Sequence, residues 1–204
     1  MEPGDSILLA AGFFNPTDQP FDAVYLRLHV VYADARHDTR HESVLPLYLD
    51  AVPPGQVTFD VPPGETRQSW DWQPAIAGRI LALGGHLHDN GISVELQDVT
   101  TGELLFVGNA EYGTSGALTG VSRSIFARGI RISPDRVYRV TATYLNTGTK
   151  TLTGAMGHVA GLFLPDSIED MPRADMSHPA YMSDLYGKLN RSAAGHDHGG
   201  HSGH

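Results

Sequence analysis

The chain has 204 residues, 41% of them hydrophobic, which is enough for one core of ordinary size. A formal net charge of −9 without a basic cluster argues against a nucleic-acid partner, and no apolar run approaches the roughly 18 residues of a membrane span. The absence of cysteine excludes disulfides, iron–sulfur clusters and thiolate zinc sites.

The first predicted element, FDAVYLRLHVVY at 21–32, alternates in the manner of a β-strand. Val24, Leu26 and Leu28 fall on one face, while Tyr25 and His29 fall on the other. Further short apolar or alternating runs follow it at 43–49, 56–61, 65–72, 78–88, 91–99, 103–108, 137–145 and 151–165.

Pro-Gly, Asp-Asn-Gly and Thr-Gly turn signals separate these runs at the spacing of roughly 8–12 residues that is typical of a β-sandwich or barrel. We therefore predict an all-β fold in which residues 1–165 form a single antiparallel β-sandwich of the jelly-roll type. Residues 166–191 are expected to be irregular, with one or two helical turns within 178–190.

Residues 192–204 form a low-complexity tail that contains His196, His198, His201 and His204. The tail is too polar to pack, so we expect it to be disordered. Purification tags are usually uninterrupted histidine runs, which favours a natural tail. Its composition suggests weak collection of copper(II) or zinc for the sandwich, a role that unchanged copper loading after deletion of the tail would exclude.

The segment GGHLHDNG at 84–91 has the pattern of a metal site at the end of a strand. Residues i and i+2 of a strand point to the same face, so His86 and His88 can direct both imidazoles at one ion while Leu87 points into the opposite layer. Asp89 to Gly91 then reverse the chain, with Gly91 suited to a positive φ. Gly84 and Gly85 are expected to leave room beside the ligands. The alternative is a strand end with two incidental surface histidines.

A second segment, TLTGAMGHVAGLFLP at 151–165, is predicted to be one late strand in which Met156 and His158 share a face. A methionine thioether is a good ligand for copper(I) and a poor one for hard ions. Together with neutral imidazoles, which suit copper and zinc alike, it favours copper, with zinc as the alternative. The other interpretation is that Met156 fills a gap in the core.

These two segments resemble the C-terminal domain of the copper type II, ascorbate-dependent monooxygenases, the family of peptidylglycine α-hydroxylating monooxygenase and dopamine β-monooxygenase. The resemblance spans about residues 20–165 and depends on the two segments 84–98 and 144–165. It implies a jelly-roll domain with one copper held by His86, His88 and Met156. The family pattern does not require a ligand at His158, which is a candidate fourth contact because it shares a face with Met156.

Three features depart from that family. The enzymes have two such domains, whereas this chain has room for one. They bind a second copper through three histidines, and the adjacent His-His pair that serves that copper is missing here. They are also rich in disulfides, which a chain without cysteine cannot form. The resemblance therefore supports the fold and a copper site better than it supports hydroxylation.

Two other metal sites fit the sequence less well. His29, His37 and His41 are the remaining histidines upstream, and solvated side chains account for them more simply than a second metal site. Cupins are jelly rolls with a His-x-His motif, but they place a glutamate four or five residues after the second histidine. Here Glu95 comes seven residues after His88, and no later Gly-rich segment supplies the usual last histidine.

Three functions remain open from the sequence. The first is a secreted or periplasmic copper-binding protein, its signal already removed, that handles copper or uses it for redox chemistry with a copper donor or electron-transfer partner. The second is a one-domain copper monooxygenase with an external electron donor. The third is a β-sandwich binding module with incidental histidines. The sequence is compatible with a monomer or a dimer.

Overall fold

The computed structural model describes residues 13, 15, 18–29, 43–173, 175–179, 181 and 182. The chain divides into two compact units, one formed by residues 41–176 and the other by residues 1–40 together with 177–204. All strands of the described residues lie in the first unit. Among the described residues, no helix has the length and apolar character needed to cross a bilayer.

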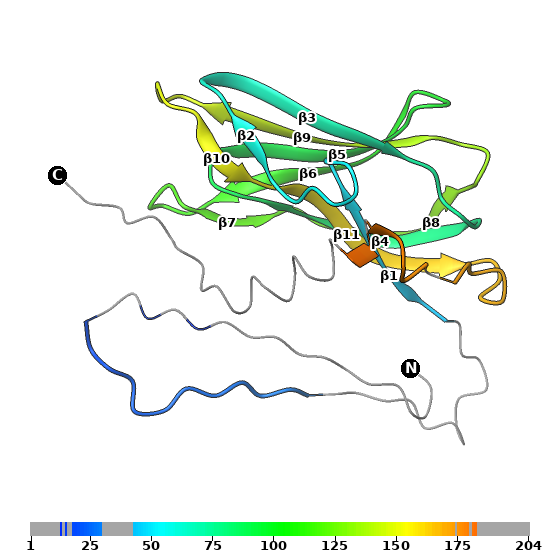
Figure 1. Ribbon diagram of the computed structural model, residues 1–204, viewed down its shortest axis with the longest axis horizontal. Coiled ribbons are helices and arrows are strands. Elements are labelled where there is room, and N and C mark those ends of the chain that lie inside the picture. The colour runs from blue at the N-terminus through cyan, green and yellow to red at the C-terminus, as the bar shows by residue number, and fades with distance from the viewer. Residues whose placement is uncertain are drawn as a thin grey trace. The chain divides into compact units, whose positions relative to one another are not determined.

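The strands of the first unit follow one another with short connections (Figure 1). Their bounds are β1 (Leu45–Asp50), β2 (Phe59–Val61), β3 (Gly64–Trp72), β4 (Gly78–Leu87), β5 (Gly91–Asp98), β6 (Glu103–Tyr112), β7 (Leu118–Val121), β8 (Ser124–Ile132), β9 (Tyr138–Asn146), β10 (Leu152–Ala155) and β11 (Gly157–Pro165).

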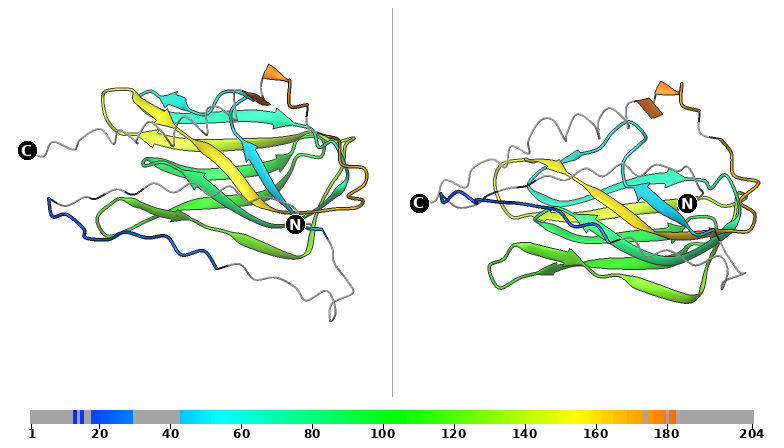
Figure 2. Two further views of the ribbon diagram at one scale, coloured as in Figure 1. Left: turned by 60° about the horizontal axis from the view of Figure 1, so that its bottom comes forward. Right: turned by 90° about the horizontal axis from the view of Figure 1, so that it is seen from below.

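The strands form two main antiparallel layers, which Figure 2 shows from two further sides. One layer has the order β1-β11-β4-β8 and the other the order β3-β9-β5-β6-β7, while β10 and β2 make a separate two-stranded pair. The prediction of an all-β antiparallel sandwich is therefore confirmed.

The core lies between the two layers because alternate residues of each strand point inward. On β9, Tyr138, Val140, Ala142 and Tyr144 are all fully buried. Leu83 and Val159 face them from the four-stranded layer, and Tyr138 stacks on Trp72 with ring centres 5.2 Å apart. The two largest fully buried side chains of the described residues, Tyr138 and Tyr144, thus come from β9.

Two strands, β7 and β8, were not predicted. The alternation of β8 is broken because Gly129 has a positive φ of 67° and the pairing of β8 with β4 shifts register between Ile80 and Ala82. A bulge of this kind moves later side chains to the other face, so a search for strict alternation misses the strand. The late run 151–165 was predicted as one strand but forms two, β10 and β11, because Met156 belongs to neither of them.

The predicted strand at 21–32 is not found in the part of that range that the structure describes. Residues 21–29 lie in no strand, and large apolar side chains such as Phe21, Tyr25 and Leu28 are exposed. Alternation makes a segment suitable for a sheet, but a strand also requires a paired neighbour. Residues 30–32 lie outside the described residues.

The helical turns predicted within 178–190 are described only at their start, where Pro179, Tyr181 and Met182 are helical. The Met182 amide donates to the His178 carbonyl at 3.1 Å, which is the spacing of one helical turn. The tail at 192–204 lies outside the described residues.

Asp98, the last residue of β5, allows a prediction about pH. Its carboxylate is almost fully buried and accepts hydrogen bonds from the Thr101 amide at 3.1 Å and from Arg136 at 2.9 Å. Burial alone would raise the pKa of Asp98, but these donors outweigh it and hold the pKa below its ordinary value. A depressed pKa in the folded state gives stability at neutral pH that is lost as pH falls through that pKa.

We therefore expect Asp98→Asn to lower the free energy of unfolding by about 1–3 kcal/mol at pH 7. The loss should shrink below about pH 4, where the unfolded carboxyl of the wild type takes up its proton. Urea unfolding at pH 7 and pH 3 measures both. Asp71→Asn is the control, because Asp71 pairs with Arg139 at the exposed surface. Equal losses in the two variants would contradict the prediction.

Candidate metal centre

The candidate ligands lie where three neighbouring strands of the four-stranded layer meet at one end of the sheet. The antiparallel register pairs Asp50 of β1 with His158 of β11, and His158 with His86 of β4. Directly opposite residues of neighbouring strands project on the same side of a sheet. One carboxylate and two imidazoles therefore form a row across β1, β11 and β4.

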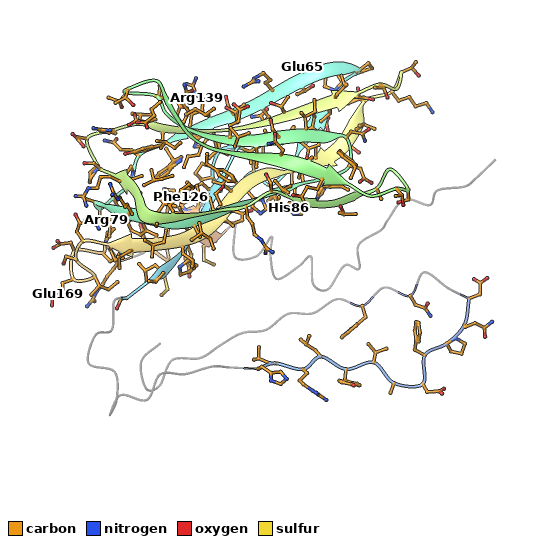
Figure 3. The ribbon with its side chains drawn as sticks, turned by 180° about the vertical axis from the view of Figure 1, so that it is seen from behind. Glu65, Arg79, His86, Phe126, Arg139 and Glu169 are labelled. Atoms are coloured by element: carbon orange, nitrogen blue, oxygen red, sulfur yellow. The ribbon has the colours of Figure 1, made fainter. Side chains whose placement is uncertain are left out.

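The row faces outward because the residues beside it point into the sandwich. Leu87 is 2% exposed and lies in the core, as predicted, while His86 is exposed. In Figure 3 the His86 side chain projects away from the layers of the sandwich. On β11, Gly157 points inward, since a Cβ there would lie 2.2 Å from that of Ala142.

One expectation about the glycines was wrong. Gly85 does not leave room beside the ligands, because it faces the interior, where a Cβ would lie 2.4 Å from a methyl carbon of Val94. Gly84 lies on the same outward face as His86, and a Cβ there would be in ordinary contact with Arg123 at 3.7 Å. Only Gly84 therefore borders the candidate site.

His86 and His88 have a geometry that suits two ligands of one ion. His88 follows the end of β4, yet the ring centres are 5.2 Å apart and the rings meet edge-to-face at 83°. Metal–nitrogen bonds of about 2.0–2.1 Å place an imidazole centre about 3 Å from the ion, so two tetrahedral ligands have centres about 5 Å apart. The separation of the two ring centres therefore matches that of two ligands of one ion.

The turn after His88 differs from the prediction in one respect. The positive φ, 70°, belongs to Asn90 and not to Gly91. Gly91 is required for another reason, since a Cβ there would lie 2.8 Å from that of Leu87. The turn is held from outside: Tyr112 donates to the Gly91 carbonyl at 2.7 Å, and Asp89 accepts from the Leu118 amide at 3.0 Å.

His158 is oriented by two side chains of β1. Tyr48 donates its hydroxyl proton to Asp50 at 3.2 Å, and its oxygen lies 3.1 Å from His158 Nδ1. Nδ1 of His158 is therefore in hydrogen-bond contact with Tyr48, and the tautomer of the ring sets which of the two donates. A ligand histidine in proteins is typically held in this way by its second ring nitrogen. The His158 ring lies 4.8 Å from that of His86, nearly parallel to it.

Met156 lies in the link between β10 and β11, on the continuation of the same ladder. The register pairs Leu87 with Gly157, so the next pair would join His88 to Met156, but the ladder stops before it. The Tyr144 hydroxyl stands there instead. It accepts the His88 amide at 2.8 Å and donates to the Met156 carbonyl. The two predicted ligand segments are thus joined through one side chain.

The electrostatic environment favours neutral imidazole at His86. Partial removal of the ring from water lowers the pKa of His86, and repulsion from His88 lowers it further. Metals bind the neutral form, so the shift reduces competition from protons. Burial raises the pKa of Tyr144 to about 12, which keeps its hydroxyl protonated and able to donate.

Within the described part of the chain, no three His, Asp or Glu side chains are arranged so that they alone could hold a metal ion. Met156, next to Gly157 in the chain, adds a thioether to the candidate donors, and two imidazoles with a thioether are a ligand set that suits a soft ion such as copper(I). Sequence reasoning missed Tyr48, Asp50 and Tyr144, because no local pattern connects them to the histidines.

Two other histidines are described, His29 and His178, and both are exposed and belong to the other compact unit. His37, His41 and the four histidines of the tail lie outside the described residues. Glu95 faces outward on β5 and pairs with Arg67 at 3.2 Å.

Comparisons with known proteins give no family. No family model matches the chain, and no curated protein matches it. One similar solved structure is that of the VP2 subviral particle of infectious bursal disease virus, at 12% identity and a TM-score of 0.30. The match covers 68% of this chain and 35% of the viral chain. The structure of the Gx strain of the same virus has 12% identity and a TM-score of 0.26, with coverages of 71% and 37%. This chain spans about a third of the length of those chains.

The two neighbouring glycines before His86 provide a test of the site's orientation. Gly85→Ala should lower the free energy of unfolding by about 1–3 kcal/mol, because the new methyl overpacks the core against Val94. Gly84→Ala, the control, should change it by less than about 0.5 kcal/mol because its methyl meets only Arg123 at the surface. Chemical denaturation measures the free energy of unfolding of both variants. Equal losses would contradict the inward orientation of Gly85.

Proposed function

We propose that this chain is a copper-binding protein that holds one ion through His86, His88 and Met156, with His158 as a candidate fourth contact. Its role is copper handling or copper redox chemistry outside the cytoplasm. Bound copper would supply a one-electron redox centre that alternates between copper(I) and copper(II). The protein contributes the ligands, their spacing and the exposed rim at which they lie.

The observation that carries the proposal is the meeting of the two ligand segments at one end of the β4–β11 ladder. His86 and His158 are paired across it, and His88 and Met156 follow directly after its last pair, Leu87 and Gly157. Four donor residues from two short segments therefore lie within two steps of one ladder. Surface histidines without a shared role would have no reason to lie opposite each other in neighbouring strands.

The choice of copper over zinc depends on Met156. Both metals accept imidazole, but only a soft ion gains from a thioether. The neighbours of Met156 support a ligand role, since Ala155 and Gly157 are buried and leave Met156 partly exposed. A methionine that served only to fill the core would point inward and be buried, as Ala155 and Gly157 are.

The first test is metal loading of the purified protein. We expect one tightly bound copper(I) per chain, and a rise in melting temperature that grows with the ratio of free copper to its dissociation constant. Met156→Ala should weaken copper(I) binding at least about tenfold and leave zinc binding unchanged. Mass spectrometry and competition with a copper(I) chelator measure stoichiometry and affinity.

Met176→Ala is the matched control, since Met176 is an exposed thioether outside the candidate site. It should bind copper(I) like the wild type. Wild-type protein without stoichiometric copper, or equal affinity in the Met156 and Met176 variants, would reduce the histidines to surface residues of a β-sandwich binding module.

A second candidate function, a one-domain copper monooxygenase, is favoured by the exposure of His86 and His88, which leaves the centre accessible to small molecules. Oxygen uptake by the copper-loaded protein with ascorbate separates the two functions. Copper-dependent uptake that disappears in His86→Ala favours the enzyme, and tight copper binding without uptake favours copper handling.

A further inference from the structure

Tyr144 stands between the two halves of the candidate centre, although nothing in its sequence neighbourhood suggests a role there. It belongs to β9 in the five-stranded layer, whereas the ligands belong to the opposite layer. Its side chain crosses the core, is fully buried, and contacts the Phe59 ring edge-on with centres 5.5 Å apart. Its hydroxyl therefore reaches the β4–β11 ladder from inside the molecule.

The hydroxyl takes the place of one backbone hydrogen bond. In a continuous ladder, strand partners such as His88 and Met156 would bond directly, with nitrogen and oxygen about 2.9 Å apart. Here the His88 amide donates to Tyr144 at 2.8 Å, and Tyr144 donates to the Met156 carbonyl. One oxygen atom is thus inserted between the two main chains, so the strand ends separate while they stay connected.

We infer that Tyr144 is a positioning residue that sets the spacing between His88 and Met156, and so makes the soft ligand part of the centre. This inference rests on the proposed copper function. The hydroxyl touches no metal and acts through the two main chains. Without it, the His-x-His pair keeps its own turn, held by Tyr112 and Asp89, while Met156 loses its fixed distance from that pair.

The test is Tyr144→Phe, which removes the hydroxyl and keeps the buried ring. The control is Tyr138→Phe on the same strand, because Tyr138 is equally buried and its hydroxyl accepts the Ser133 amide at 3.0 Å. Outer partners of metal ligands typically contribute about 10–100-fold to affinity. We expect Tyr144→Phe to raise the copper(I) dissociation constant by that factor and to leave zinc affinity within about threefold, and Tyr138→Phe to change neither.

X-ray absorption of the copper(I)-loaded proteins gives a spectroscopic signature that a general loss of stability would not produce. The copper–sulfur contribution should decrease in Tyr144→Phe and persist in Tyr138→Phe. Equal copper(I) affinity and equal copper–sulfur scattering in the two variants would overturn the inference while the wild-type loading still supports the proposed function. Absence of copper from the wild type would overturn both.

Amide hydrogen exchange of the metal-free wild type gives a readout that requires no variant. The His88 amide should exchange as slowly as the Ser133 amide, since each is bound to the hydroxyl of a buried tyrosine. If Tyr144→Phe folds, exchange at His88 should accelerate in it alone. A His88 amide that exchanges at the rate of an open loop in the wild type would show that the bridge is absent and overturn the inference.

Discussion

The close approach of the two layers at one end of the sandwich is the constraint on which the candidate centre depends. Gly85 of β4 lies against Val94, and Gly157 of β11 lies against Ala142, at distances that admit no side chain. Because residues of a strand alternate, an inward glycine at 85 and at 157 sends the following histidine outward in each strand. The same packing that closes the core therefore brings His86 and His158 together on the outer face.

Polar contacts from distant parts of the chain also hold the segments that carry the candidate ligands. Tyr144 reaches through the core to the main chains of His88 and Met156, while Tyr48 orients His158 from the edge strand β1. Buried hydroxyls keep their positions because an unpaired polar group in the core costs free energy. The segments that carry the candidate ligands are thus held by the fold on both sides, while His86 and His88 are exposed and Met156 and His158 are partly exposed.

Sequence patterns predicted most of the strands because alternation and turn residues are local signals. They failed where the signal depends on a partner. The alternation of 21–32 predicts a strand, yet residues 21–29 lie in none, and β8 was missed because a bulge interrupts its period. A single sequence records which face of a strand is apolar, but it does not record which segment lies beside it.

The sequence by itself determined the all-β class and the choice of candidate donor residues, since His-x-His and a glycine-flanked methionine are visible without coordinates. Only the tertiary structure decided their arrangement. The register that pairs His86 with His158, the inward orientation of Gly85, and the insertion of Tyr144 between His88 and Met156 all depend on contacts between strands far apart in the chain. Such contacts follow from how two sheets fill the space between them, which no local pattern of residues encodes.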